Sequence, residues 1–352
     1  MKKDKSLNQI FSLQVDADPI LDQNKAFDFQ QDDFHLASDE DKVNFIEMKK
    51  SMSYWQDAWR RLKKNHVAMI ALYIVILIIL FAFLGPLFSQ YDYDEQIRGS
   101  ENIAPCWEHP FGTDNAGRDI LVRTMFGTRV SLIIGVVASL IVLVIGSTYG
   151  AIAGFVGGRV DDVMMRFSEL ICTVPDILVV LLLTTVMKTP LQNAFNTSDL
   201  AIIKSLSVLG PSLVAIFIAF GLLYWVPLAR IIRGQVLMLK EQEFVTAAKA
   251  LGASSSKIIM KHLLPNCIGQ IIVTTCLEIP AAIFLESFLS FLGLGVSAPM
   301  TSLGSMAAAA LGGMYSYTYR LIIPSIILSV MILSLNLFGD GLRDALDPRL
   351  KK

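Results

Sequence analysis

Residues 241–266 read EQEFVTAAKALGASSSKIIMKHLLPN, a polar stretch between two long apolar runs. Within it, apolar side chains recur at the three- and four-residue intervals of a helix, and charged and hydroxyl groups occupy the other positions. The apolar positions are Phe244, Ala248 and Leu251, followed by Ile258, Ile259 and Leu263. The pattern predicts two short amphipathic helices in succession.

The ends of these two helices are marked in the sequence. Gly252 can adopt the left-handed conformation that ends a helix, and Ser254 or Ser255 can cap the next one. Pro265 is expected to stop the second helix before the following apolar run. Such a helix pair has no core of its own. It either lies on a lipid surface or docks on a partner protein, and the spacing alone leaves both open.

Composition places this stretch in a polytopic membrane protein. Hydrophobic residues make up 53% of the 352 and charged residues only 17%, with a mean hydropathy of +0.54. A soluble protein of this length is much less apolar. The net charge of −1 gives no sign of nucleic-acid binding. The cysteines have no metal-ligand spacing and are interpreted as small core residues; they are Cys106, Cys172, Cys267 and Cys276.

Hydropathy divides the chain into four parts. Residues 1–50 form an acidic tail that is expected to be disordered and cytoplasmic, and 51–66 form an interfacial anchor of aromatic and basic residues. Residues 67–338 hold six predicted spans, with an outer loop at 88–130 and an inner loop at 226–270, and 339–352 form a cytoplasmic tail. The predicted spans cover 67–87, 131–154, 170–187, 206–225, 271–289 and 321–338.

Glycines mark a packing surface on the second span. Gly146, Gly150 and Gly154 recur every four residues, so they lie on one face of a helix. A ridge of small residues lets another helix approach closely. We expect this face to pack against a neighbouring span.

The distribution of cations predicts the orientation. With the N-terminus inside, the predicted inner segments carry more than twice as many Lys and Arg as the outer ones. The positive-inside rule then places both termini and residues 241–266 in the cytoplasm. No GxxxxGK[ST] phosphate loop, metal-ligand cluster or catalytic triad is recognisable in the sequence, so the chain is not expected to be an enzyme.

The polar stretch resembles the EAA loop of ABC importer permeases. Thr246-Ala247-Ala248, then Gly252, then His262-Leu263-Leu264-Pro265 match that motif, although Thr246 stands where its name has Glu. The resemblance implies a type I permease fold, all α, whose coupling helix between spans four and five docks on an ATP-binding subunit. The residues assigned to coupling are Glu243, Phe244, Thr246, Ala247, Ala248, Leu251, Gly252, His262, Leu264 and Pro265.

Longer motifs resemble the dipeptide and oligopeptide importer branch of this family. They are HPFGTDNAGRD at 109–119, GGRVDDVMMR at 157–166, ESFLSFLGLG at 286–295 and GDGLRDALDPR at 339–349. The resemblance implies a peptide importer of the cell membrane, with a homologous second permease, two ATP-binding subunits and an extracytoplasmic binding protein. ATP and Mg would be bound by the ATP-binding subunits, and this chain would bind no cofactor or metal.

Ionisable residues in or beside the spans are candidates for a transport pathway, because a charge facing lipid is costly. For Asp176, a pathway position and a structural hydrogen bond are equally open, and Glu278 precedes Pro280 and could satisfy a broken backbone. Glu286 is a candidate outer gate or a helix-end ion pair. Arg230 and Arg233 either extend to lipid head groups or act near an inner gate.

Two alternatives to peptide import remain open from the sequence. The same architecture could carry nickel, glutathione or another small solute. A secondary transporter is the other class, but it predicts inverted repeats and midplane charges, which the sequence does not display.

Overall fold

The computed structural model describes residues 53–198, 200–296, 298 and 300–346. Six of its helical stretches are long and apolar enough to cross a membrane, which confirms the predicted number of spans. They are His66–Phe83, Ile120–Val156, Asp176–Thr197, Pro211–Leu239, Ile268–Phe291 and Tyr319–Leu346. The predicted tail at 1–50 and residues 347–352 lie outside the described residues.

The membrane-length helices are α3 (His66–Phe83), α4 (Ile120–Val156), α6 (Asp176–Thr197), α13 (Ile268–Phe291) and α15 (Tyr319–Leu346). The fourth span is built from α8 (Pro211–Ala219), the π-helical turn η4 (Phe220–Tyr224) and α9 (Val226–Leu239). The remaining elements are α2 (Tyr54–Lys64), η3 (Gly85–Phe88), α5 (Gly158–Thr173), α7 (Ala201–Ser207), α10 (Glu243–Ala250), α11 (Ser255–Ile258), the π turn η5 (Ile259–Leu263), α12 (Leu264–Asn266), α14 (Leu303–Ala310) and η6 (Leu311–Gly313).

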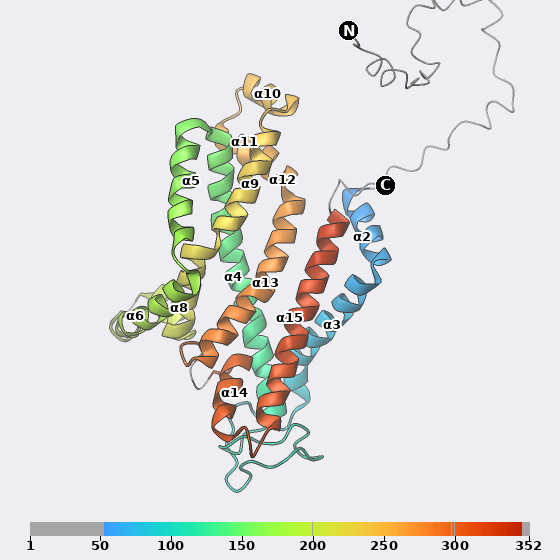
Figure 1. The fold of residues 1–352 in the computed structure, drawn as a ribbon, viewed down its shortest axis with the longest axis vertical. Coiled ribbons are helices and arrows are strands. Elements are labelled where there is room, and N and C mark those ends of the chain that lie inside the picture. The colour runs from blue at the N-terminus through green and yellow to red at the C-terminus, as the bar shows by residue number, and fades with distance from the viewer. Residues whose placement is uncertain (1–52, 199, 297, 299, 347–352) are drawn as a thin grey trace, which may run out of the picture. The chain divides into compact units, whose positions relative to one another are not determined.

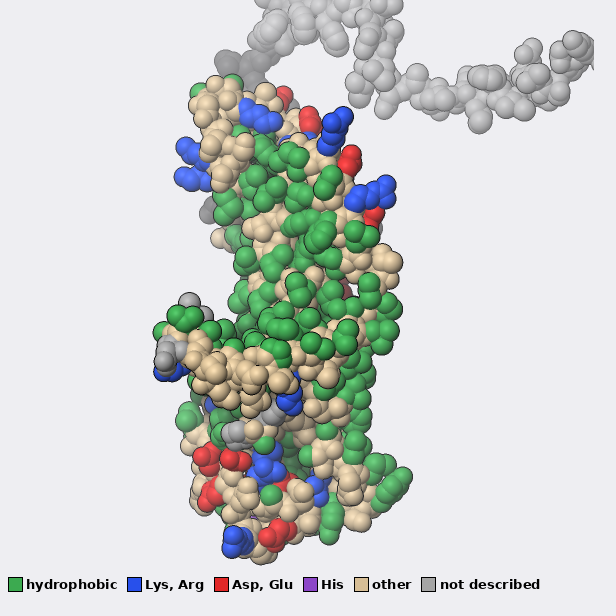
Figure 2. All heavy atoms as spheres, turned by 90° about the vertical axis from the view of Figure 1, so that its left-hand side faces the viewer, with side chains coloured by type: hydrophobic (Ala, Val, Ile, Leu, Met, Phe, Trp, Pro, Cys, Tyr) green, Lys and Arg blue, Asp and Glu red, His purple; other side chains and the backbone are tan. Residues whose placement is uncertain are grey.

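Within residues 53–346 the helices form a bundle with two distinct ends (Figure 1). Helices α10 and α11 lie at one end, and the loop 89–119 lies with α14 at the other. Figure 2 shows hydrophobic side chains over the middle of one face and most charged side chains toward its two ends. This distribution is expected for a protein that crosses a bilayer.

The glycine ridge predicted on the second span is the contact between α4 and α9. A Cβ on Gly146 would meet the Trp225 carbonyl oxygen at 2.9 Å, and one on Gly154 would meet the Arg233 carbonyl oxygen at 2.8 Å. At Gly150 the added atom would collide with the Ala229 backbone. The absence of side chains thus lets the two backbones approach closely, as predicted.

The second span is much longer than predicted. Helix α4 has 37 residues and begins at Ile120, so the outer loop ends at Asp119 rather than at 130. Residues 120–130 contain two arginines, which are more usual outside a membrane span, but both side chains are hydrogen-bonded to backbone carbonyl groups. Arg123 donates to the Tyr93 carbonyl at 3.2 Å, and Arg129 donates to the Ala82 carbonyl at 3.1 Å.

Other predicted boundaries also differ from the structure. The third span is broken at Pro175, because a residue before proline disfavours helix, and α5 and α6 therefore replace the single run 170–187. Helix α9 continues to Leu239, which shortens the inner loop predicted at 226–270. Helix α15 extends to Leu346, so the predicted tail at 339–352 begins as helix. Gly85 and Pro86 end the first span in η3, earlier than the predicted 87.

Candidate coupling site and pathway face

The coupling segment, residues 243–266, is attached to the bundle by three buried side chains. Val245 and Leu263 are 0% exposed and Ile258 is 1% exposed. All three belong to the apolar cluster that also contains α4 and α9 residues. The segment is therefore fixed to the spans from both of its helical parts and is not a free loop.

The opposite side of the coupling segment presents apolar side chains outward. Leu251 is 88% exposed and Phe244 is 40% exposed, although both are large and hydrophobic. Of the residues assigned to coupling, Ala248, His262 and Leu264 are half-buried, and Glu243, Phe244, Thr246, Ala247, Leu251, Gly252 and Pro265 are exposed. Phe244 and Leu251 are thus apolar side chains held at the surface of a fixed scaffold, where another molecule can contact them.

Gly252 ends α10 as the sequence predicts. Its φ is +78°, its N–H donates to the Lys249 carbonyl at 2.9 Å, and the Ala253 N–H donates to the Ala248 carbonyl at 3.0 Å. These two bonds define a Schellman motif, in which the residue at the Gly252 position must be left-handed. The direction in which the chain leaves α10 thus depends on this glycine.

The second half of the segment differs from the prediction. Ser254 occupies the N-cap position of α11, but its side chain makes no capping hydrogen bond. Pro265 does not end the helix, because it lies in the first turn of α12, where proline is tolerated. The helical path continues through η5 and turns at Cys267 before α13 begins.

Two contacts link the coupling end of the bundle to α4, α5 and α9. The ammonium of Lys249 lies 5.4 Å from the centre of the Phe155 ring, which joins α10 to the end of α4. Arg233 of α9 donates two hydrogen bonds to the Asp161 carboxylate of α5, at 2.5 and 2.6 Å. A bidentate pair of this kind fixes orientation as well as distance.

Three of the five pathway candidates lie on α6 and α9, and α5 carries the Asp161 partner of one of them; we call the surface of these three helices the α5–α9 face. Arg233 is paired with Asp161, so the prediction that it extends to head groups is wrong. Arg230 lines a polar cavity of about 720 Å³ together with Asp162, Arg166 and Glu169. Asp176 is exposed and accepts a hydrogen bond from the Tyr224 hydroxyl at 3.0 Å, which ties α6 to η4. Charges of both signs on this face require water or protein beside it rather than lipid tails.

Glu286 and Glu278 lie elsewhere, on α13. Glu286 is 0% exposed and accepts hydrogen bonds from Ser290 at 2.6 Å and from Ser131 of α4 at 3.1 Å. The predicted helix-end ion pair is wrong, since within the described residues Glu286 has only serine partners. Glu278 is half-buried and makes no hydrogen bond to any described residue, so the structure does not give it the predicted backbone role.

The serines around Glu286 extend to the end of the bundle where α14 lies. The Ser290 hydroxyl also accepts hydrogen bonds from the Val296 N–H at 3.0 Å and from the Ser302 hydroxyl at 3.3 Å. Ser302 is the N-cap of α14. One buried carboxyl group therefore connects α13, α4 and the start of α14, a network that the sequence does not reveal.

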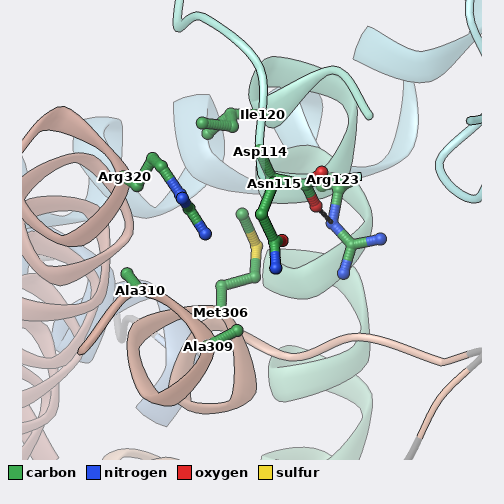
Figure 3. Close-up of a pocket in the computed structure, with 8 residues that line it drawn as sticks. All are labelled: Asp114, Asn115, Ile120, Arg123, Met306, Ala309, Ala310 and Arg320. Atoms are coloured by element: carbon green, nitrogen blue, oxygen red, sulfur yellow. Dashed lines mark ion pairs between the residues drawn. The ribbon is translucent and has the colours of Figure 1, made fainter. Parts of the chain in front are cut away.

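The motif at 109–119 builds the start of α4. His109 Nδ1 lies 2.8 Å from Asp119 Oδ2, and Asp119 Oδ1 accepts the Val122 N–H at 2.9 Å as the helix N-cap. Asp114 accepts the Arg118 side chain at 2.8 Å. Figure 3 shows Asp114 and Arg123 beside Met306 of α14 and Arg320 of α15, around a small cavity of about 20 Å³. The motif thus caps α4 and lies beside α14 and α15.

The cysteines are only partly core residues. Cys267 is buried, and burial raises the pKa of its thiol to about 11, while Cys276 is half-buried. Cys106 and Cys172 are exposed, so the interpretation of these two as core residues is wrong.

Six membrane-length helices with a polar helix pair fixed at one end define a polytopic all-α membrane protein. A family model described as binding-protein-dependent transport system inner membrane component matches residues 146–352, and one described as the N-terminal TM domain of oligopeptide transport permease C matches 53–105. The chain therefore belongs to the family of binding-protein-dependent transport permeases, which have the type I ABC permease fold.

Curated relatives agree with this assignment. The chain is 44% identical over 316 residues to the oligopeptide transport system permease protein OppC of Bacillus subtilis, which covers 90% of this chain and 95% of that protein. It is 45% identical over 303 residues to the dipeptide transport system permease protein DppC of the same organism, covering 86% and 88%. It is 40% identical over 299 residues to OppC of Escherichia coli K12, covering 84% and 92%. The resemblance to the dipeptide and oligopeptide branch is thus confirmed.

Proposed function

We propose that this chain is one of two permease subunits of an ATP-driven importer for dipeptides and oligopeptides, and that its coupling segment docks on a separate ATP-binding subunit. The observation that carries the proposal is the outward-facing pair Phe244 and Leu251 on a segment anchored by Val245, Ile258 and Leu263. Covering apolar side chains of this size with a partner protein removes them from water, which is favourable. The peptide cargo is inferred from the named activities of the relatives.

The proposed assembly contains a homologous second permease, two ATP-binding subunits and an extracytoplasmic binding protein that delivers the peptide. ATP and Mg are bound by the ATP-binding subunits. Both termini and the coupling segment face the cytoplasm, because the segments at that end of the bundle carry most of the Lys and Arg residues. The second permease and the water-filled pathway cover the α5–α9 face, where Arg230 and Asp176 are exposed.

Movement is transmitted through the contacts at the coupling end. When the ATP-binding subunits close, they displace α10, and the cation–π contact of Lys249 with Phe155 carries the displacement to α4. The Asp161–Arg233 pair holds α5 to α9, so these two helices move together. Alternating access then follows if the α5–α9 faces of the two permeases move apart at one end of the bundle and come together at the other end.

Cysteine cross-linking tests the docking proposal. After replacement of the four native cysteines, Leu251→Cys is expected to cross-link to the ATP-binding subunit, since that position is 88% exposed. Phe88→Cys, 87% exposed at the opposite end of the bundle, is the matched control and should not cross-link to it. Labelling of Leu251→Cys by a membrane-impermeant reagent added outside intact cells would contradict the proposed orientation. Loss of uptake of a labelled dipeptide after deletion of the gene tests the cargo separately.

A further inference from the structure

A second polar cavity lies at the coupling end, between α2, α9, α12, α13 and α15. Its volume is about 730 Å³. The polar and aromatic side chains that line it are Tyr54, Trp55, Gln235, Asn266, Gln270 and Arg343. Unlike the cavity beside Arg230, which contains Asp162 and Glu169, this one is lined by no acidic residue of the described chain.

Hydrogen-bond donors in the cavity are available to a ligand. Arg343 is exposed and makes no ion pair or hydrogen bond with any described residue. The side-chain amides of Gln235 and Gln270 likewise have no hydrogen-bond partner among the described residues. A guanidinium and two amides with no carboxylate opposite them in the described part of the chain form an environment that favours an anion, and a guanidinium matches a phosphate particularly well.

The walls of the cavity are fixed by packing. Ala58 of α2 packs in one buried cluster with Val273 of α13 and Leu346 of α15. The Tyr54 hydroxyl donates to the Leu346 carbonyl at 3.2 Å, and it lies so close to Gly269 that a Cβ there would come within 2.6 Å of it. Helix α2 is therefore held against α13 and α15, and the cavity does not depend on a loose loop.

The position of α2 identifies the source of the anion. This helix directly precedes the membrane-length α3 and exposes Trp55 (51%) and Trp59 (48%). Lys63 lies 5.5 Å from the Trp59 ring centre. Exposed tryptophans and cations beside a span are typical of the head-group region of a bilayer. At this depth the abundant anion is the phosphate of a phospholipid.

We propose that this cavity binds the head group of an anionic phospholipid, with the phosphate on Arg343 and the amides of Gln235 and Gln270. Ile268, which also lines the cavity and is 37% exposed, contacts the apolar part of the lipid below the head group. The ligand contacts Gln235 of α9, which precedes the coupling segment, and Asn266, which is the last residue of that segment. Bound lipid thus stabilises the spacing between the two ends of that segment. The proposal does not depend on the cargo or the direction of transport.

Native mass spectrometry of the full chain, purified with the subunits that accompany it, tests this binding. Phosphatidylglycerol and phosphatidylcholine are titrated separately in a neutral detergent. Wild type is expected to retain phosphatidylglycerol preferentially, and Arg343→Gln to lose about fivefold in its retention, the usual effect of one cation on anionic lipid. The matched control is Arg60→Gln, which removes an exposed cation of α2 that does not line the cavity. It should retain the lipid as wild type does.

Three outcomes would overturn the proposal. The first is equal retention of both lipids by wild type, or unchanged phosphatidylglycerol retention in Arg343→Gln. The second is displacement of the lipid by inorganic phosphate alone, which would make the site one for free phosphate. The third is efficient cross-linking of Gln270→Cys to an ATP-binding subunit in phosphatidylglycerol-containing membranes, because a protein would then occupy the cavity. The folding of Arg343→Gln is checked by its assembly with the same subunits.

Discussion

Replacing Gly150 by alanine is expected to force α4 and α9 apart. The new Cβ would lie 3.0 Å from both the carbonyl carbon and the Cα of Ala229, and closer still to its oxygen. Carbon atoms prefer separations of about 3.5 to 4.0 Å, so the helices must separate by about 0.5 to 1 Å. The atoms in the way belong to the backbone and cannot rotate aside. Overpacking of this kind costs about 1 to 3 kcal/mol.

The matched control for this prediction is Gly234→Ala on α9. A Cβ at Gly234 would meet nothing within 4 Å, so the substitution adds no clash in the same helix pair. Alanine also has the better helix propensity, by about 1 kcal/mol. In purified protein, the midpoint of thermal unfolding should fall for Gly150→Ala and remain equal or rise for Gly234→Ala.

A double variant separates the backbone clash from ordinary side-chain crowding. Adding Ala229→Gly removes a methyl group from the contact but leaves the three backbone atoms that Gly150→Ala would meet. The double variant is therefore expected to be at least as unstable as Gly150→Ala, because the clash remains and glycine at position 229 also lowers helix propensity. Full recovery, or an unfolding midpoint of Gly150→Ala equal to that of wild type, would refute the reasoning.

Three further predictions concern the coupling end and the buried carboxyl group. Gly252→Val should leave the chain inserted and assembled but stop peptide uptake, because valine disfavours a φ of +78°. Gly252→Asn should retain uptake, since asparagine tolerates that conformation. Equal uptake by both variants would argue against a role for this turn. Ser131→Ala removes a hydrogen bond to the buried carboxyl group of Glu286 and should lower stability by about 1 to 3 kcal/mol in thermal unfolding. A change within error would mean that the carboxyl group of Glu286 does not need its hydrogen bond from α4. Arg233→Gln leaves the side chain of Asp161, which is 8% exposed, without its partner, and it should destabilise the assembled chain by roughly 1 to 3 kcal/mol. The double variant that also carries Asp161→Asn should recover this stability. No recovery would show that Arg233 acts through other contacts.

The architecture was predictable because it depends on local composition. Runs of apolar residues predict six spans, and glycines at intervals of four predict the α4–α9 contact. Gly252 was predictable for the same reason, because a helix end with a glycine is a local signal. The assignment of the chain to peptide importer permeases rested on motifs that are likewise read within short stretches.

Features that depend on distant contacts were not predictable. Ser131 and Glu286 are 155 residues apart, and neither neighbourhood indicates the other. Arg123 and Arg129 look like loop residues until their carbonyl partners are known. The break before Pro175 is different, because the proline was visible, and the hydropathy of the run outweighed it in the prediction of a single span.

One π-helical turn precedes α10 and one follows it: η4 lies inside the fourth span and leads into α9, and η5 lies in the coupling segment and leads into α12 and α13. A π turn contains one residue more than an α-helical turn needs. When that surplus residue moves along a helix, everything beyond it rotates by about 100° and advances by about 1.5 Å. In the proposed mechanism, a pull on α10 that moved these surplus residues would rotate and advance the adjoining helices, and so turn their side chains toward or away from the pathway without tilting a whole helix through the bilayer.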